Sequence, residues 1–181
     1  MRDGCHERRT IDLSAPPNHT PIVGTAPWPG SAPLSLHWGD ENATQAFAAR
    51  LASHAAIGGA FIELQGDLGA GKTTFVRHLL RALGVQGRIK SPTYAVVEPH
   101  ETAGFPAWHF DFYRFDDPRE WEDAGFRDVF DGPGLKLAEW PEKAAGLLPV
   151  PDLVVRIEMR PDGSRDVQVS AHTPRGRELL A

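Results

Sequence analysis

The sequence predicts an α/β layered fold, in which a central, mostly parallel sheet is flanked by helices and antiparallel strands lie toward the C-terminus. Short strand-like runs alternate with segments of helical periodicity, which is typical of layered domains. A glycine-rich loop separates one strand-like run from the helix that follows it. The chain has 181 residues, of which 41% are hydrophobic, and this is enough for the core of one domain.

The first segment, residues 1–33, contains six prolines and little periodic apolar content. This composition predicts a flexible extension, although a start codon assigned too early explains it equally well. The single cysteine, Cys5, lies in this segment and cannot form an intramolecular disulfide, which fits a reducing compartment. We expect the folded domain to span residues 34–181.

The composition of the whole chain disfavours several classes of protein. A net charge of −5 disfavours a stand-alone nucleic-acid binder, whose affinity comes from neutralising phosphates. No apolar run approaches the roughly 20 residues of a membrane span. The N-terminal MRDGCHERRT lacks the apolar region of a signal peptide, and the eight histidines show no paired metal-ligand spacing. We therefore expect a cytoplasmic protein with no membrane contact and no zinc site.

The first predicted helix covers residues 40–56, with Asp40 as a plausible N-cap and a glycine pair at 58–59 that ends it. Its apolar stripe consists of Ala43, Phe47, Leu51 and Ala55. A short buried strand follows at 60–64, then the glycine-rich loop, then a second helix over residues 72–83. The downstream pattern predicts strands at 94–98, 107–115, 135–140, 152–159 and 165–172, with a helical segment at 118–130.

The glycine loop, GDLGAGKTT at residues 66–74, matches G-x-x-x-x-G-K-[ST] in a strand–loop–helix context. Its glycines allow successive N–H groups to point inward, and the following helix adds a favourable field for an anion. Lys72 is expected to reach the β and γ phosphates, and Thr73 to ligate Mg²⁺. This motif predicts a P-loop NTPase-like fold. The nucleotide contacts are expected from Asp67, Leu68, Gly69, Ala70, Gly71, Lys72, Thr73 and Thr74.

Such a site also needs a carboxylate at the end of a strand to hold the metal or its waters. Asp111 and Glu139 both qualify: Asp111 lies within HFDFYR and Glu139 ends LKLAE. A carboxylate at the carboxyl end of a strand lies where ligands gather in α/β sheets. Spacing alone does not choose between them, and either is compatible with a solvated edge residue.

A basic segment from Lys72 to Lys90 adjoins the loop, with five basic residues and no acidic one between positions 68 and 97. It offers a contact for RNA or an acidic partner, and a solvated helix face is the alternative.

Together these segments resemble the TsaE family of bacterial ATPases required for the tRNA modification threonylcarbamoyladenosine. The resemblance runs from about Leu36 to the C-terminus, and the extension to residue 33 has no counterpart in it. The matching segments are GDLGAGKTT (66–74), KSPTY (90–94), HFDFYR (109–114), GFRDVF (125–130) and EWPEK (139–143).

The resemblance implies a role for several residues around bound ATP and Mg²⁺. It implies that Glu139 is the magnesium ligand together with Thr73, and that Asp111 takes part in hydrolysis with Lys72. It further implies that residues 91–93 form a switch-like loop near the γ-phosphate and that Trp140 lies near the nucleotide. The helix start at residues 40–44 is implied to help hold the adenine, with Glu41 as the named residue.

In function, the resemblance implies an accessory ATPase of the machinery that modifies adenosine 37 of tRNA. The partners would be TsaD, which transfers the threonylcarbamoyl group, and TsaB, with tRNA contacted indirectly or through the basic segment. No arginine lies within the glycine loop, so we expect slow hydrolysis unless a partner supplies positive charge. The alternatives are a nucleotide-gated binding module that does not hydrolyse ATP and a small-molecule kinase.

Overall fold

The computed structural model describes residues 32–117 and 119–181, so Cys5 and nearly all of the predicted extension lie outside the described residues. The elements are β1 (Leu34–Trp38), α1 (Glu41–Ala52), η1 (Ala55–Gly59), β2 (Phe61–Gln65), α2 (Lys72–Ala82), β3 (Val97–Glu101), β4 (Pro106–Asp111), α3 (Arg119–Asp123), α4 (Phe126–Asp131), β5 (Leu135–Glu139), η2 (Pro141–Ala144), β6 (Leu153–Met159), β7 (Arg165–Ala171) and α5 (Pro174–Leu180).

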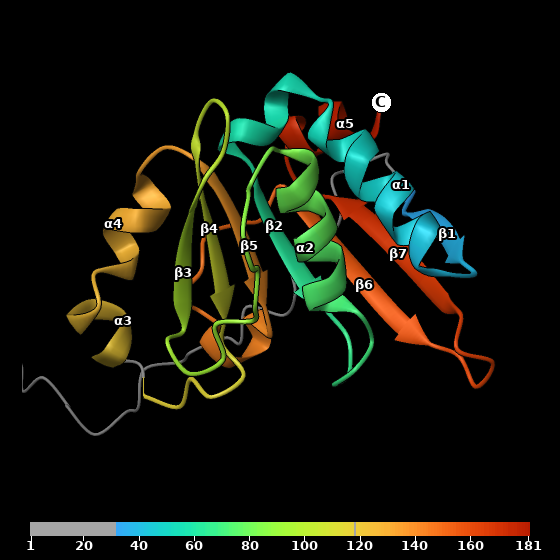
Figure 1. The fold of residues 1–181 in the computed structure, drawn as a ribbon. Helices are drawn as coiled ribbons and strands as arrows, with labels where there is room; N and C mark the ends of the chain where they lie inside the picture. The colour runs from blue at the N-terminus through green and yellow to red at the C-terminus, as the bar shows by residue number, and fades with distance from the viewer. Residues whose placement is uncertain (1–31, 118) are drawn as a thin grey trace, which may run out of the picture.

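One seven-stranded sheet, in the order β1-β7-β6-β2-β5-β4-β3, organises the fold (Figure 1). The central strands β6, β2, β5 and β4 are parallel, so their carboxyl ends meet at one edge. The antiparallel strands lie at both sides of this centre, as β7 and β1 on one side and β3 on the other. The predicted α/β class is confirmed, with antiparallel pairing at the β3 edge as well as in the C-terminal strands.

The strand β2 separates two apolar cores because successive side chains of a strand point to opposite faces. On one face, Ile62 and Leu64 pack in a cluster with residues of α1 and α2, including Phe47 and Phe75. Figure 1 shows these two helices over the same face of the sheet. On the other face, Phe61 joins an aromatic cluster. Its buried members are Phe61, Phe110, Phe112, Phe115, Trp121, Phe126, Ala138 and Ala144.

The first helix begins as the sequence predicts, since the Asp40 side chain accepts a hydrogen bond from the Ala43 N–H at 3.0 Å. It ends earlier, at Ala52, and a separate 3₁₀ turn covers residues 55–59. The helical segment predicted at 118–130 is divided into α3 and α4 by Gly125, whose φ of +67° is incompatible with continuing a helix.

The strand predicted at 94–98 is wrong in position, because β3 starts only at Val97. The N–H groups of Ala95 and Val96 both donate to the Pro92 carbonyl, at 2.9 and 2.7 Å, which makes a turn of this segment. Val96 adopts a φ of +65°, an uncommon conformation for a β-branched residue. The predicted strand 107–115 likewise ends at Asp111. Strand β1 and helix α5 were not predicted as elements.

Among the described residues, no helix has both the length and the apolar character that a membrane crossing requires.

Glu63 is a carboxylic acid in the middle of the central strand β2, on the same face as Phe61. Burial raises the pKa of Glu63 to about 7, and the nearby charge of Glu142 acts in the same direction. A hydrogen bond of 3.5 Å from the Gln65 amide opposes the shift but does not cancel it. The folded protein therefore retains this proton at pH values at which the unfolded chain has lost it.

We expect the free energy of unfolding to fall as the pH rises from 4.5 toward about 7, because the unfolded chain releases the Glu63 proton first. Glu63→Gln should remove this fall and exceed the native chain in stability by about 3 kcal/mol near pH 8, with little difference near pH 4. Denaturant unfolding across this pH range measures the effect. Glu101→Gln, at an exposed position of β3, is the control. Identical pH profiles for all three chains would mean that Glu63 titrates normally.

Candidate functional site

The glycine loop wraps around the N-terminus of α2 directly after β2. Gly66, Gly69 and Gly71 have φ values of +139°, +83° and +110°, which only glycine adopts without strain. A Cβ on Gly66 would lie 2.2 Å from the Ile157 carbonyl oxygen, so the loop packs closely against β6. Glycines with positive φ thus precede the N-terminus of the 11-residue helix α2. This arrangement of backbone N–H groups is typical of an anion-binding loop.

Lys72 points back into this loop and is only 4% exposed. Its ammonium group donates to the carbonyl oxygens of Gly66, at 2.5 Å, and Asp67, at 2.9 Å. It also lies 3.8 Å from the ring centre of Trp140. Burial lowers the pKa of Lys72, whereas surrounding carboxylates, with Glu139 the strongest, act to raise it. The positive charge of Lys72 is thus held at the glycine loop, in contact with the ring of Trp140.

Trp140 reaches this position through an unusual backbone. It is the residue between β5 and η2, and its φ of +58° lies in the left-handed region. Tyr113 packs against its ring with a centroid separation of 5.1 Å. Because Trp140 directly follows Glu139 along the chain, the same turn that ends β5 sets the position of the ring over Lys72.

Both candidate carboxylates lie at the carboxyl edge of the parallel sheet. Asp111 ends β4 and Glu139 ends β5, and the two are register partners on neighbouring strands. The Thr73 hydroxyl donates to both oxygens of Glu139, at 2.8 and 3.0 Å. This pair therefore joins the first turn of α2 to the end of β5.

His109 was not named as a site residue, yet it supports Glu139. It is wholly buried on β4, and its Nε2 lies 2.9 Å from Glu139 Oε1. Since an ionised carboxylate only accepts hydrogen bonds, Nε2 is the donor. The signal was present in the sequence, because residues two apart on a strand share a face and His109 stands two before Asp111.

Asp111 is held by the segment SPT, residues 91–93. One carboxylate oxygen accepts hydrogen bonds from the hydroxyls of Ser91 and Thr93, the latter at 2.7 Å. The other oxygen accepts from the Tyr113 N–H at 3.0 Å. The main chain adds a further link, since the Asp111 N–H donates to the Val96 carbonyl at 2.9 Å. The segment predicted to be switch-like is thus fastened to Asp111 at both its ends.

Most of the predicted site residues surround one open cavity of about 360 Å³. Among the described residues, Lys72 is the only cation that lines it. The lining residues are Leu68, Gly69, Gly71, Lys72, Thr73, Thr74, Ser91, Thr93, Asp111, Tyr113, Glu139 and Trp140. Asp67 and Ala70 do not line it, and the Leu68 side chain is 74% exposed.

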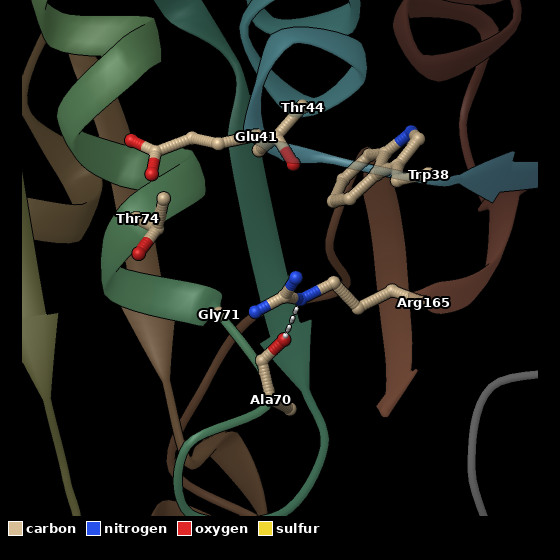
Figure 2. A pocket seen from close by; sticks show the side chains of 7 residues that line it. All are labelled: Trp38, Glu41, Thr44, Ala70, Gly71, Thr74 and Arg165. Atoms are coloured by element: carbon tan, nitrogen blue, oxygen red, sulfur yellow. Dashed lines mark hydrogen bonds between the residues drawn. The ribbon is translucent and has the colours of Figure 1, made fainter. Parts of the chain in front are cut away.

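A second, smaller pocket of about 60 Å³ adjoins the same loop on the side of α1 (Figure 2). Glu41 lines it, and its carboxylate pairs with His78 Nε2 at 2.8 Å. Arg165, from β7, was not predicted and had no signal in the sequence. The lining residues are Trp38, Glu41, Thr44, Ala70, Gly71, Thr74 and Arg165.

The donor set of the larger cavity fits magnesium in the manner of a nucleotide site. The Thr73 hydroxyl and the Glu139 carboxylate are hard oxygen donors, which Mg²⁺ prefers. Within residues 32–117 and 119–181 no group of three or more His, Cys, Asp or Glu side chains is placed to hold a metal alone. An ion with few protein ligands, completed by water and phosphate oxygens, matches this arrangement.

The basic segment Lys72–Lys90 divides into different environments. Lys72 lies in the loop, and Arg81 donates to the Val85 carbonyl at 2.8 Å, where it closes the end of α2. Arg88 and Lys90 are exposed. The segment is therefore not one continuous basic face.

Comparison with known proteins gives consistent results. The family model "Threonylcarbamoyl adenosine biosynthesis protein TsaE" matches residues 38–167. The chain is 44% identical over 120 residues to the tRNA threonylcarbamoyladenosine biosynthesis protein TsaE of Haemophilus influenzae, covering 66% of this chain and 75% of that protein. It is 34% identical over 137 residues to the TsaE protein of Bacillus subtilis, covering 75% and 85%. The crystal structure of YdiB from Bacillus subtilis superposes with a TM-score of 0.65 at 27% identity, covering 83% of this chain and 94% of that one.

We expect His109→Leu to weaken the Mg²⁺-dependent part of ATP affinity by about tenfold or more, because Glu139 loses the donor that orients it. His109→Gln places an amide donor near the same point and should retain most of that affinity. ATP titrations with and without Mg²⁺ measure the difference, and thermal unfolding of both variants checks the fold. An equal loss of affinity with and without Mg²⁺ would contradict the role assigned to His109.

Proposed function

This chain belongs to the TsaE family of tRNA threonylcarbamoyladenosine biosynthesis proteins, and on that premise we propose that it is an accessory ATPase of that process. It binds Mg-ATP through the glycine loop, in the cytoplasm, and hydrolyses it slowly in support of the TsaD–TsaB transferase. The observation that carries the proposal is the bond of the Thr73 hydroxyl to both oxygens of Glu139, at 2.8 and 3.0 Å.

Nucleotide binding follows from the orientation of the loop. The N–H groups of residues 67–74 and the start of α2 receive the phosphates. Lys72 exchanges its hydrogen bonds with the Gly66 and Asp67 carbonyls for bonds to phosphate oxygens, which are stronger acceptors because they carry charge. The centre of the Trp140 ring lies 3.8 Å from the ammonium group, and the ring stabilises its charge.

Thr73 and Glu139 hold the magnesium ion, which when bound neutralises charge on the β- and γ-phosphates. Glu139 is suited to this because it is 3% exposed and its oxygens are already fixed by Thr73 and His109. A preorganised carboxylate costs little reorganisation when charge develops in the transition state.

Asp111 orients the attacking water. Water oxygen bonds to the γ-phosphorus as the bond to the β–γ bridging oxygen breaks, which yields ADP, inorganic phosphate and a proton. A carboxylate has about four acceptor positions, and three donors already occupy Asp111. One acceptor position therefore remains for the water. The three donors withdraw charge from the carboxylate and weaken its hold on that water, and this limits the rate in the isolated chain.

A partner protein removes a second limit on the rate of hydrolysis. Lys72 is the only cation lining the phosphate cavity in the described part of the chain. An arginine supplied by another protein typically accelerates hydrolysis by about 10³–10⁵-fold. TsaD and TsaB are the proposed source, and tRNA contacts this chain indirectly or through Arg88 and Lys90, the exposed end of the basic segment.

Magnesium-dependent ATP hydrolysis by the purified chain, alone and with TsaB and TsaD, tests the proposal. We expect a low basal rate that the partners raise by about tenfold or more, and no activity in Lys72→Ala, because the β- and γ-phosphates lose their cation. Arg127→Ala, on the exposed surface of α4, is the matched control and should behave as the native chain. A fast rate for the isolated chain would contradict the dependence on a partner.

Asp111→Asn separates hydrolysis from binding. The variant should bind ATP within about threefold of the native affinity and hydrolyse it about 100-fold more slowly, since the amide orients water poorly. The readouts are ATP titration and phosphate release. A variant that stops hydrolysing ATP yet supports TsaD–TsaB modification of tRNA at the native rate would favour the nucleotide-gated binding module.

A further inference from the structure

Two of the pockets beside the glycine loop meet at the start of α2, and they indicate a direction for a bound nucleotide. A further pocket of about 720 Å³ lies between the loop and β6 and is lined by neither Gly71 nor Thr74. Of the two that meet, the larger cavity contains Asp111, Ser91 and Thr93, the residues assigned to the γ-phosphate. The smaller pocket lies on the side of α1 and contains none of them. The two share Gly71 and Thr74, at the junction of the loop and α2. When the γ-phosphate of a nucleotide lies near Asp111, its α-phosphate therefore lies at this junction. The nucleoside then lies on the side of α1.

Arg165 projects into that junction from the first position of β7. Figure 2 shows its guanidinium reaching across from β7 to the end of the loop, where Nε donates to the Ala70 carbonyl at 3.2 Å. A Cβ built on Gly71 would lie 3.4 Å from the same nitrogen. Nη1 donates to the Gly163 carbonyl at 2.9 Å. The guanidinium is thus anchored against the loop residue that precedes Lys72.

The two hydrogen bonds that anchor Arg165 leave some of its N–H groups available as donors. A guanidinium carries five N–H groups in a fixed plane, and two of them are used by Ala70 and Gly163. Nη2 makes no hydrogen bond within the described residues. The stem of Arg165 is supported by Trp38, its register partner on β1, which is itself 3% exposed and stacks on Phe75. Because these contacts hold the planar guanidinium in place, Arg165 loses little side-chain entropy when it binds an anion.

The pocket suits a phosphate group. Of the residues that the structure describes, Arg165 is the only cation that lines it. Glu41 is the only carboxylate, and it is paired with His78. The pocket volume of about 60 Å³ is the space of a few water molecules, which admits phosphate oxygens.

On the premise of the proposed nucleotide binding, we propose that Arg165 contacts the α-phosphate of the bound nucleotide. Lys72 and the metal act on the β- and γ-phosphates, and Arg165 supplies positive charge at the α-phosphate. Pyrophosphate that fills only the β and γ positions therefore does not reach Arg165, whereas ATP and ADP do. Because it acts on the α-phosphate, Arg165 does not replace the cation missing from the γ-phosphate.

Calorimetric titration of the full chain with Mg-ATP, Mg-ADP and magnesium pyrophosphate tests the assignment. We expect Arg165→Gln to weaken ATP and ADP by about 10–100-fold, the loss of one charged hydrogen-bonding group. Pyrophosphate, which fills only the positions beside Lys72 and Thr73, should bind within about threefold of the native affinity. Arg127→Gln removes the same charge from the exposed surface of α4 and should change none of the three affinities.

Arg165→Lys keeps the charge but not the planar fork, and it serves as the second variant if Arg165→Gln folds poorly. It should bind ATP with intermediate affinity and pyrophosphate normally. An equal loss for pyrophosphate and ATP would overturn the inference in favour of a role in holding the loop. Unchanged ATP affinity in a folded Arg165→Gln chain would overturn it outright. A native chain that binds neither ATP nor pyrophosphate would instead refute the proposed function itself.

Discussion

The bond between Thr73 and Glu139 is the interaction on which the site depends. A carboxylate that is 3% exposed is costly unless its oxygens are hydrogen-bonded, and Glu139 meets this requirement through Thr73 on α2 and His109 on β4. Three elements far apart in the sequence are thereby locked at one edge of the sheet. The position of Trp140 over Lys72 follows, because it is the next residue in the chain.

Much of the site is readable from the sequence because its signals are local. The glycine loop, Lys72 and Thr73 stand in one nonapeptide whose backbone requirements are nearly unique. Asp111 and Glu139 were both named as candidate metal-site carboxylates, and there is a physical reason why their spacing did not choose between them. They are register partners on parallel neighbours, so each reaches the same edge of the sheet.

The rest of the site could not be predicted from the sequence, because it depends on pairing between strands that are far apart in the chain. Strand β1 joins the sheet through β7, so Trp38 and Arg165 meet across 127 positions of sequence. No local pattern marks Arg165 as a neighbour of the loop. The misplaced start of β3 has a different cause, since the β-forming residues of YAVV were outweighed by hydrogen bonds to the Pro92 carbonyl. Gly125 likewise divided a segment whose composition favoured one helix.

The backbone of Val96 has a consequence for the populations of the SPT segment. A β-branched residue at a φ of +65° raises the free energy of the fastened arrangement by about 1–3 kcal/mol, which the hydroxyl bonds to Asp111 must offset. Any arrangement that frees Asp111 and lets Val96 relax recovers this energy. The equilibrium constant for release is then about 5- to 150-fold larger than with a relaxed residue at this position. A bound phosphate therefore has to supply correspondingly less binding energy to shift the segment.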